Sequence, residues 1–130
     1  MILDASAAID LLLEREPMAS WVRTEILGAS RIRAPHVIDA EVAGTVRRIV
    51  LAGGMTVERG GRALEDFARM PIRRYPQRRM LRRVWSLRDN VSAFDGFYVV
   101  LAESLGAPLV TTDGALVRAP GLEIEIRAFA

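Results

Sequence analysis

Short apolar runs alternate along this 130-residue chain with longer segments whose apolar residues recur every three to four positions. The short runs predict buried strands, and the longer period predicts amphipathic helices. Strands that alternate with helices favour an α/β fold, in which a mostly parallel sheet is covered by helices on both faces. The sequence has no internal repeat and no linker, so we expect one domain that spans residues 1–130.

The punctuation by glycine and proline sets the expected boundaries of these elements. The predicted strands are residues 1–3, 32–34, 71–75, 109–112 and 122–127. The predicted helices are residues 6–14, 17–28, 36–52, 56–69, 77–88 and 93–105, with one more short helix after residue 112. Ser6 is the expected N-cap of the first helix, and Gly106 is the expected residue just beyond the end of the sixth.

Composition excludes several classes of chemistry. The chain is 51% hydrophobic and 26% charged, which is enough apolar material for a real core. It has no cysteine, which excludes disulfides, thiolate zinc sites and a cysteine nucleophile, and favours a cytoplasmic protein. It also has no lysine, which excludes Schiff-base chemistry and a Walker-type phosphate loop. The sequence contains no run of about 18 apolar residues, so no membrane span is predicted.

The basic residues are all arginines, and they are unevenly placed. The segment between Asp66 and Asp89 holds many arginines and no acid. Such a segment in a nearly neutral chain indicates a polyanionic partner, with nucleic acid first, although a solvated helix face is the alternative. The candidate contacts for a nucleic acid are Arg78, Arg79, Arg82 and Arg83. The opposite, apolar face of the same predicted helix holds Met80, Leu81, Val84, Trp85 and Leu87.

Two acids directly follow predicted strands. Asp4 comes after the first strand, and Asp113 comes after the strand at 109–112. Ligand sites in parallel sheets form outside the carboxyl ends of the strands, so both acids are candidates for one site. Each can equally be an ordinary helix cap.

Two further acids lie on predicted helices. Glu41 falls beside the apolar stripe of its helix, where an unpaired carboxylate costs several kcal/mol, so it needs a metal or a salt bridge, for example to Arg47 or Arg48. Asp95 follows Ser92 at the spacing of a capping box, but it also lies next to apolar residues of a helix that we expect to be buried.

If the sheet brings these four acids together, their charges repel one another. Two carboxylates about 4 Å apart repel by about 4 kcal/mol at an effective dielectric of roughly 20, so the cluster takes up protons or binds a cation. Ligation by oxygen alone favours Mg²⁺ or Mn²⁺, and the single histidine, His36, gives zinc little support. Magnesium held by carboxylates is common machinery for cutting a phosphodiester with a metal-activated water.

These motifs resemble the PIN-domain nucleases, and among them the VapC toxins of bacterial toxin–antitoxin pairs. The resemblance is carried by MILDASAAIDLLL, HVIDAEV and SAFDGFYVVLAESLGAPLVTTD and covers nearly the whole chain. It implies a three-layer α/β/α fold and an endoribonuclease that holds Mg²⁺ or Mn²⁺. The implied metal ligands are Asp4, Glu41, Asp95 and Asp113. Ser6 and Thr111 are implied to assist by holding an acid, a water or a phosphate.

The resemblance also implies partners: an RNA substrate, a cognate antitoxin that inserts a segment into a groove, and assembly as a homodimer or with the antitoxin as a larger hetero-oligomer. The helices at 17–28 and 36–52 are candidates for the groove. His36 departs from the small hydroxyl residues common at its position, and Asp10 and Asp39 are interpreted as helix-surface or outer residues rather than ligands.

Two other hypotheses remain open from the sequence. A PIN-like module that binds RNA or protein without cutting would keep the fold and lose the metal. A phosphatase or response regulator with Asp4 as phosphate acceptor would need a nearby lysine, which this chain lacks.

Overall fold

A parallel five-stranded sheet forms the centre of the protein, as described by a computed structural model for residues 1–129. Its strands are β1 (Ile2–Leu3), β2 (Ile32–Pro35), β3 (Ile72–Tyr75), β4 (Leu109–Thr111) and β5 (Ile126–Ala128). All four strand pairings are parallel, which confirms the predicted α/β class.

The helices lie in the connections between the strands. They are α1 (Ala5–Leu12), α2 (Met18–Leu27), α3 (Val37–Leu51), α4 (Val57–Arg69), α5 (Leu81–Ser86), α6 (Ala93–Leu105) and α7 (Gly114–Arg118), with a 3-10 turn, η1, at Arg78–Met80. Most of these bounds agree with the predicted ones to within two residues. Gly106 follows α6 with a left-handed φ of 58°, as expected for the residue that ends a helix. None of the helices within residues 1–129 has the length and apolar character needed to cross a membrane.

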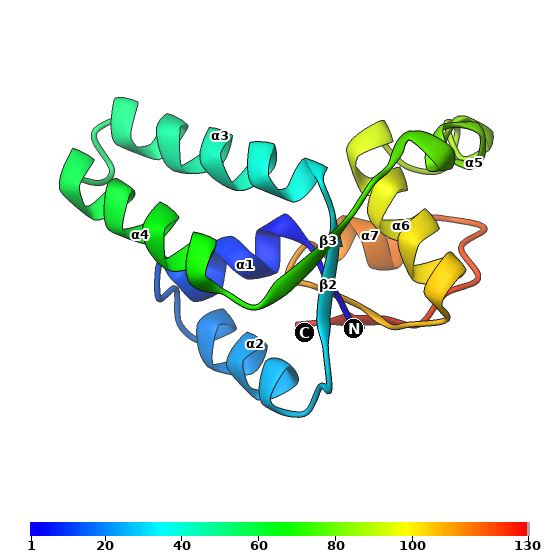
Figure 1. The fold of residues 1–130 in the computed structure, drawn as a ribbon, viewed down its shortest axis with the longest axis horizontal. Coiled ribbons are helices and arrows are strands. Elements are labelled where there is room, and N and C mark those ends of the chain that lie inside the picture. Colours follow the sequence, from blue (N-terminus) through cyan, green and yellow to red (C-terminus); the bar gives the residue numbers. More distant parts are fainter. Residues whose placement is uncertain (130) are drawn as a thin grey trace.

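The order of the strands places the helices in two layers. The order is β3-β2-β1-β4-β5, so the chain first builds outward from β1 to β3 and then returns to the other side of β1 at β4. Right-handed crossovers put the helices of the outward half on one face and those of the returning half on the other. Figure 1 shows α1 to α4 on one side of β2 and β3, and α5 to α7 on the other. The expected three-layer arrangement is confirmed.

Three details differ from the sequence prediction. The N-cap of α1 is Asp4 rather than Ser6, because Asp4 leaves β1 in an extended conformation and its carboxylate accepts from the Ala7 amide. The last strand begins at Ile126, four residues later than predicted. The predicted helix at 77–88 divides into η1 and α5.

The division into η1 and α5 changes which apolar residues are buried. Met80, Val84 and Leu87 are buried as predicted, but Leu81 is 55% exposed and Trp85 is 68% exposed. A 3-10 turn has three residues per turn, so it shifts the face that the following α-helix presents to the core.

Candidate active site

The switch point of the sheet lies between β1 and β4, where the chain reverses its direction of building. In open parallel sheets, ligands bind outside the carboxyl ends of the strands at such a point. Asp4 follows β1, and Thr111 is the last residue of the neighbouring strand β4. Hydrogen bonding between the strands continues past β1, since the Asp4 amide donates to the Val110 carbonyl at 3.1 Å. Two segments more than 100 residues apart in sequence therefore meet here.

Asp4 is buried, with 4% of its surface exposed, and three donors hold its carboxylate. The Ser6 hydroxyl donates to Oδ1 at 2.5 Å, the Ala7 amide donates to the same oxygen at 3.1 Å, and the Thr111 hydroxyl donates to Oδ2 at 2.6 Å. A carboxylate oxygen accepts about two bonds, so Oδ1 is saturated and Oδ2 keeps one free lone pair. Ser6, predicted as a cap or as an assisting hydroxyl, is thus placed against Asp4, as is Thr111.

The two hydroxyls also fix the backbone that leads to Asp113. Thr111 Oγ1 accepts from the Asp113 amide at 2.9 Å, and Ser6 Oγ accepts from the Thr112 amide at 3.2 Å. Asp113 is exposed and caps α7, with Oδ1 accepting from the Ala115 amide at 2.9 Å. The capping interpretation of Asp4 and Asp113 is therefore correct for both, and it leaves free acceptor capacity on each carboxylate.

Asp95 and Glu41 approach the same region from two helices. Asp95 lies in the first turn of α6 and is half-buried, and Ser92 caps that turn by accepting from the Asp95 amide at 3.2 Å. Glu41 lies on α3, where its Oε1 accepts from the Tyr98 hydroxyl at 2.9 Å. Tyr98 is almost fully buried on α6, so it ties α3 to α6 beside the acids.

Burial and mutual repulsion shape the charges of these acids. Burial is the main cause that raises the pKa of Asp4, and the charge of Asp95 adds to it. Burial raises the pKa of Glu41 as well, with further contributions from Asp4 and Asp95. The pKa of Asp95 is raised by burial and by Asp113. Each acid is thus close enough to feel at least one of the others, and no salt bridge to any of the four forms within residues 1–129.

The four acids fit a hard divalent cation by donor type, since they offer only oxygen. The pKa values of Asp4, Glu41 and Asp95 are raised first by burial and then by neighbouring carboxylates, and a bound cation would favour the ionised form of each. The side chains do not form a finished cage, because across residues 1–129 no three His, Cys, Asp or Glu groups converge closely enough to hold a metal ion.

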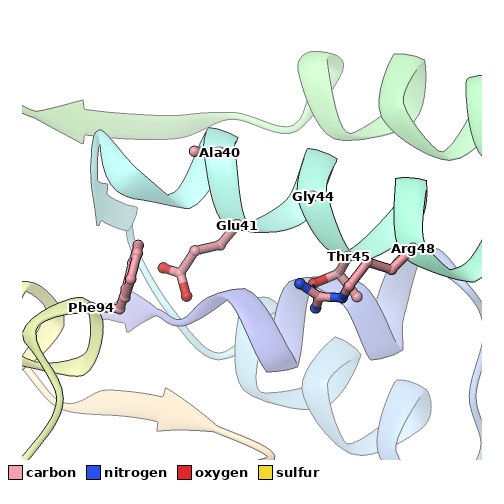
Figure 2. A pocket seen from close by; sticks show the side chains of 6 residues that line it. All are labelled: Ala40, Glu41, Gly44, Thr45, Arg48 and Phe94. Atoms are coloured by element: carbon pink, nitrogen blue, oxygen red, sulfur yellow. Dashed lines mark hydrogen bonds between the residues drawn. The ribbon is translucent and has the colours of Figure 1, made fainter.

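A cleft of about 380 Å³ opens beside Glu41. Its lining residues come from α3 and from the start of α6, and are Ala40, Glu41, Gly44, Thr45, Arg48 and Phe94. Figure 2 shows the side chains of Glu41, Thr45 and Arg48 on the same side of α3, with Phe94 facing them. Arg48, which the sequence offered as a salt-bridge partner for Glu41, instead donates to the Thr45 hydroxyl at 3.0 Å.

The remaining candidates lie outside this cluster. Arg83 is paired with Glu103 at 2.9 Å, and none of Arg78, Arg79, Arg82 and Arg83 lines the cleft beside Glu41. Asp39 pairs with Arg74 at 2.8 Å on the exposed start of α3, as its interpretation as a surface residue required. Asp10 was interpreted as a helix-surface or outer residue; it is buried on α1, with Arg15 at 3.6 Å, so it does not lie on the helix surface.

The structure adds residues that the sequence did not indicate. Tyr98 falls within an apolar run and carries no signal that its hydroxyl bonds Glu41, 57 positions away. Phe94 and Thr45 join the site because the first turn of α6 and one side of α3 line the same cleft. His36 precedes α3 at its N-cap position, is exposed, and makes no side-chain capping bond.

Comparison with known proteins places the chain in a family. The PIN domain family model matches residues 1–122. Ribonuclease VapC1 of Mycobacterium tuberculosis is 39% identical over 127 residues, which cover 97% of this chain and 95% of that protein. The crystal structure of VapC20 from M. tuberculosis, a sarcin-ricin loop cleaving toxin, superposes with a TM-score of 0.69 at 11% identity and covers 95% of this chain and 98% of its own. VapBC2 from Rickettsia felis, bound to a DNA fragment from its promoter, also has a TM-score of 0.69, at 16% identity and 99% and 98% coverage. The chain therefore belongs to the PIN domain family and, within it, to the VapC group.

Proposed function

We propose that this chain is an endoribonuclease that hydrolyses RNA phosphodiesters with the help of Mg²⁺ or Mn²⁺. The observation that carries the proposal is the acid cluster at the switch point, where burial and neighbouring negative charge raise the pKa of three carboxylates that no arginine neutralises within residues 1–129. The relatives of this chain carry the name ribonuclease, which supports RNA as the substrate.

Asp4, Glu41, Asp95 and Asp113 are the proposed metal ligands. A divalent cation held by them supplies a water of lowered pKa and stabilises negative charge on the phosphate and on the departing oxygen. Asp4 has one free lone pair on Oδ2, and within residues 1–129 Glu41 and Asp113 each accept a hydrogen bond through one side-chain oxygen only. Because the acids do not already converge as a cage, the half-buried and exposed ones must turn toward the ion while Asp4 stays fixed.

The protein's own contribution is to hold these acids ready. Ser6 and Thr111 favour the ionised form of the Asp4 carboxylate, because both donate to it, and they hold its orientation. Burial and the Glu41 charge raise the pKa of Tyr98, so its hydroxyl stays protonated and keeps donating to Glu41. Such supporting bonds fix the direction of a ligand and tune its affinity for the metal.

The proposal also covers the binding partners of the protein and its location in the cell. We propose that the chain is the toxin of a toxin–antitoxin pair, because its structural relatives include the VapBC2 and FitAB complexes. A cognate antitoxin, a homodimer and a larger hetero-oligomer with the antitoxin are the expected assemblies. We further infer that residues 1–130 act as one PIN domain in the cytoplasm, and that Arg78, Arg79 and Arg82 are available to RNA.

The test compares two acid-to-amide changes. Asp95→Asn removes a proposed ligand, while Asp39→Asn removes an exposed acid in the first turn of α3 that is paired with Arg74 on β3. We expect Asp95→Asn to abolish cleavage of cellular RNA and Asp39→Asn to leave it intact, with both variants folded by circular dichroism. Excess EDTA should stop the wild-type protein, and added Mn²⁺ should restore it. Full cleavage by Asp95→Asn, or cleavage that persists in EDTA, would contradict the metal mechanism.

A third arm addresses the inert-module alternative. Calorimetric titration of the wild-type protein with Mn²⁺ should show binding near millimolar metal, and this binding should weaken in Asp95→Asn. RNA binding without metal binding and without cuts would instead support the non-cutting PIN-like module.

A further inference from the structure

The cleft beside Glu41 has features that the metal mechanism does not use. Phe94 directly precedes the proposed ligand Asp95, yet its side chain is 56% exposed and forms one wall of the cleft. A large aromatic ring left half in water next to an acid site contributes little to folding. Its face is available to a flat ligand, and nucleobases stack on aromatic side chains regardless of sequence.

The opposite part of the cleft holds a positively charged side chain, Arg48. Arg48 lies seven residues after Glu41 on α3, which is about 10.5 Å along the helix axis at 1.5 Å per residue. Its guanidinium is fixed by the bond to the Thr45 hydroxyl, and no carboxylate pairs with it within residues 1–129. A guanidinium bonds phosphate oxygens through its forked N–H groups. Its distance from Glu41 means that a phosphate bound here is not the one beside the acids but a neighbour along the strand.

Between Phe94 and Arg48, the cleft is lined by a residue without a side chain. Gly44 lines the cleft, and a Cβ built on it meets nothing within 4 Å. Helix interiors favour alanine over glycine by about 1 kcal/mol, so this glycine costs helix stability while it leaves the cleft wide. The volume of about 380 Å³ lies within the roughly 300–1,000 Å³ of ordinary small-ligand sites.

We propose that this cleft is a nucleotide subsite of the RNA strand, in which Phe94 stacks on an unpaired base and Arg48 binds the phosphate next to the one that is cut. The subsite rests on the proposed ribonuclease function and adds a substrate class to it. A base must be unstacked and unpaired to reach Phe94, so the subsite selects single-stranded or loop RNA over a duplex.

The test measures RNA binding apart from cleavage. A labelled single-stranded RNA is titrated by fluorescence anisotropy with the Asp95→Asn protein, in which cutting is expected to be absent. Phe94→Ala should weaken binding about 5- to 150-fold, the range for loss of one base stack, and Phe94→Tyr should restore it. Gly44→Leu, which fills the cleft, should weaken binding similarly. Gly61→Leu, at an exposed position of α4 where a Cβ also meets nothing, should not.

The phosphate contact has its own readout. Arg48→Gln should reduce the slope of log Kd against log salt by about 0.7, the value for one phosphate contact to a single strand. Arg47→Gln removes the same charge from the adjacent residue, which does not line the cleft, and should change the slope far less. In the cleaving protein, Phe94→Ala and Arg48→Gln should raise KM more than they lower kcat, since neither touches the reacting phosphate.

The outcomes separate the two proposals. If the wild-type protein cuts RNA but Phe94→Ala and Gly44→Leu bind RNA like their parent, the subsite is wrong and the nuclease stands. If nothing is cut but Phe94 and Arg48 still control RNA binding, the subsite stands and the nuclease is wrong. If the cleft instead binds a segment of a protein partner, RNA binding should be unchanged in all these variants. Binding of duplex RNA as tight as that of single-stranded RNA would also overturn the subsite.

Discussion

Thr111→Val removes one buried hydroxyl and leaves a side chain of nearly the same shape. In the wild-type protein, this hydroxyl donates to Asp4 Oδ2 at 2.6 Å and accepts from the Asp113 amide at 2.9 Å. Thr111 has 0% exposure, so water cannot replace either bond at the threonine itself. The substitution therefore weakens the hold on a buried carboxylate and loosens the start of the α7 cap.

The expected cost follows from these two bonds. A hydrogen bond to a charged group contributes about 1.5–3 kcal/mol, and the lost bond from the Asp113 amide contributes about 1 kcal/mol because Asp113 is exposed and its amide can be rehydrated. We expect the free energy of unfolding to fall by about 2.5–4 kcal/mol near neutral pH without metal. With a urea m-value of about 2 kcal/mol/M, the unfolding midpoint should fall by about 1–2 M.

The pH dependence of this cost has a definite sign. Burial raises the folded-state pKa of Asp4 above its ordinary value of 3.8, and the Thr111 hydroxyl opposes that rise by favouring the ionised form. The difference between wild type and Thr111→Val should therefore be full above the raised pKa and shrink as the pH falls through it, because a protonated Asp4 needs the bond less. Wild-type stability without metal should itself fall as the pH rises from 3.8 through that raised pKa.

Urea unfolding followed by circular dichroism at several pH values measures this difference. Thr111→Ser keeps the hydroxyl and should lose only the smaller cost of a buried methyl. Thr112→Val removes the neighbouring hydroxyl, for which no side-chain bond is seen within residues 1–129, and should change stability by about 0.5 kcal/mol or less. A Thr111→Val protein as stable as wild type, or one whose deficit is the same at every pH, would refute the reasoning.

Three further predictions use the same methods. Tyr98→Phe removes the donor that lowers the pKa of Glu41, so the acidic limb of the pH profile of cleavage should move to higher pH. An unmoved limb would show that the ionisation of Glu41 does not control cleavage. The affinity for Mn²⁺ should rise as the pH rises through the raised pKa values of Asp4 and Asp95, because the ligands must lose their protons to bind the ion. Calorimetry in two buffers of different ionisation enthalpy should detect the released protons. A constant affinity would mean that the ion binds elsewhere. Gly106→Ala should cost about 1 kcal/mol at a φ of 58°, while Gly61→Ala within α4 should stabilise by about 0.5–1 kcal/mol, and equal effects would contradict this assignment of the helix end.

The periodicity of apolar residues was sufficient to predict the succession of strands and helices along the chain. The parallel sheet follows from strands such as residues 109–111, which are buried on both faces and therefore apolar throughout. Periodicity was insufficient where the helix type changes. The turn η1 precedes α5, and it leaves Trp85 exposed although a continuous helix would have buried it.

The four acids could be singled out from the sequence, and the family resemblance indicated Ser6 and Thr111 beside them, but the donor to Glu41, Tyr98, was not predicted. Asp4 and Asp113 are recognisable because each follows an apolar strand. The role of Ser6 depends on the conformation of a neighbour: once Asp4 caps α1, Ser6 is free to donate to it. The bond from Tyr98 to Glu41 joins two helices whose distance apart is set by the packing of the whole core. No local pattern encodes that distance.

The pairing of β1 with β4 has a consequence for protein synthesis. The second residue of the chain lies beside residue 109, so a growing polypeptide on the ribosome has an N-terminal strand with one neighbour still untranslated. We expect that chains truncated before Leu109 neither protect the β1 amides from hydrogen exchange nor degrade RNA. A PIN domain organised in this way should leave the messenger that encodes it intact until β4 has been synthesised.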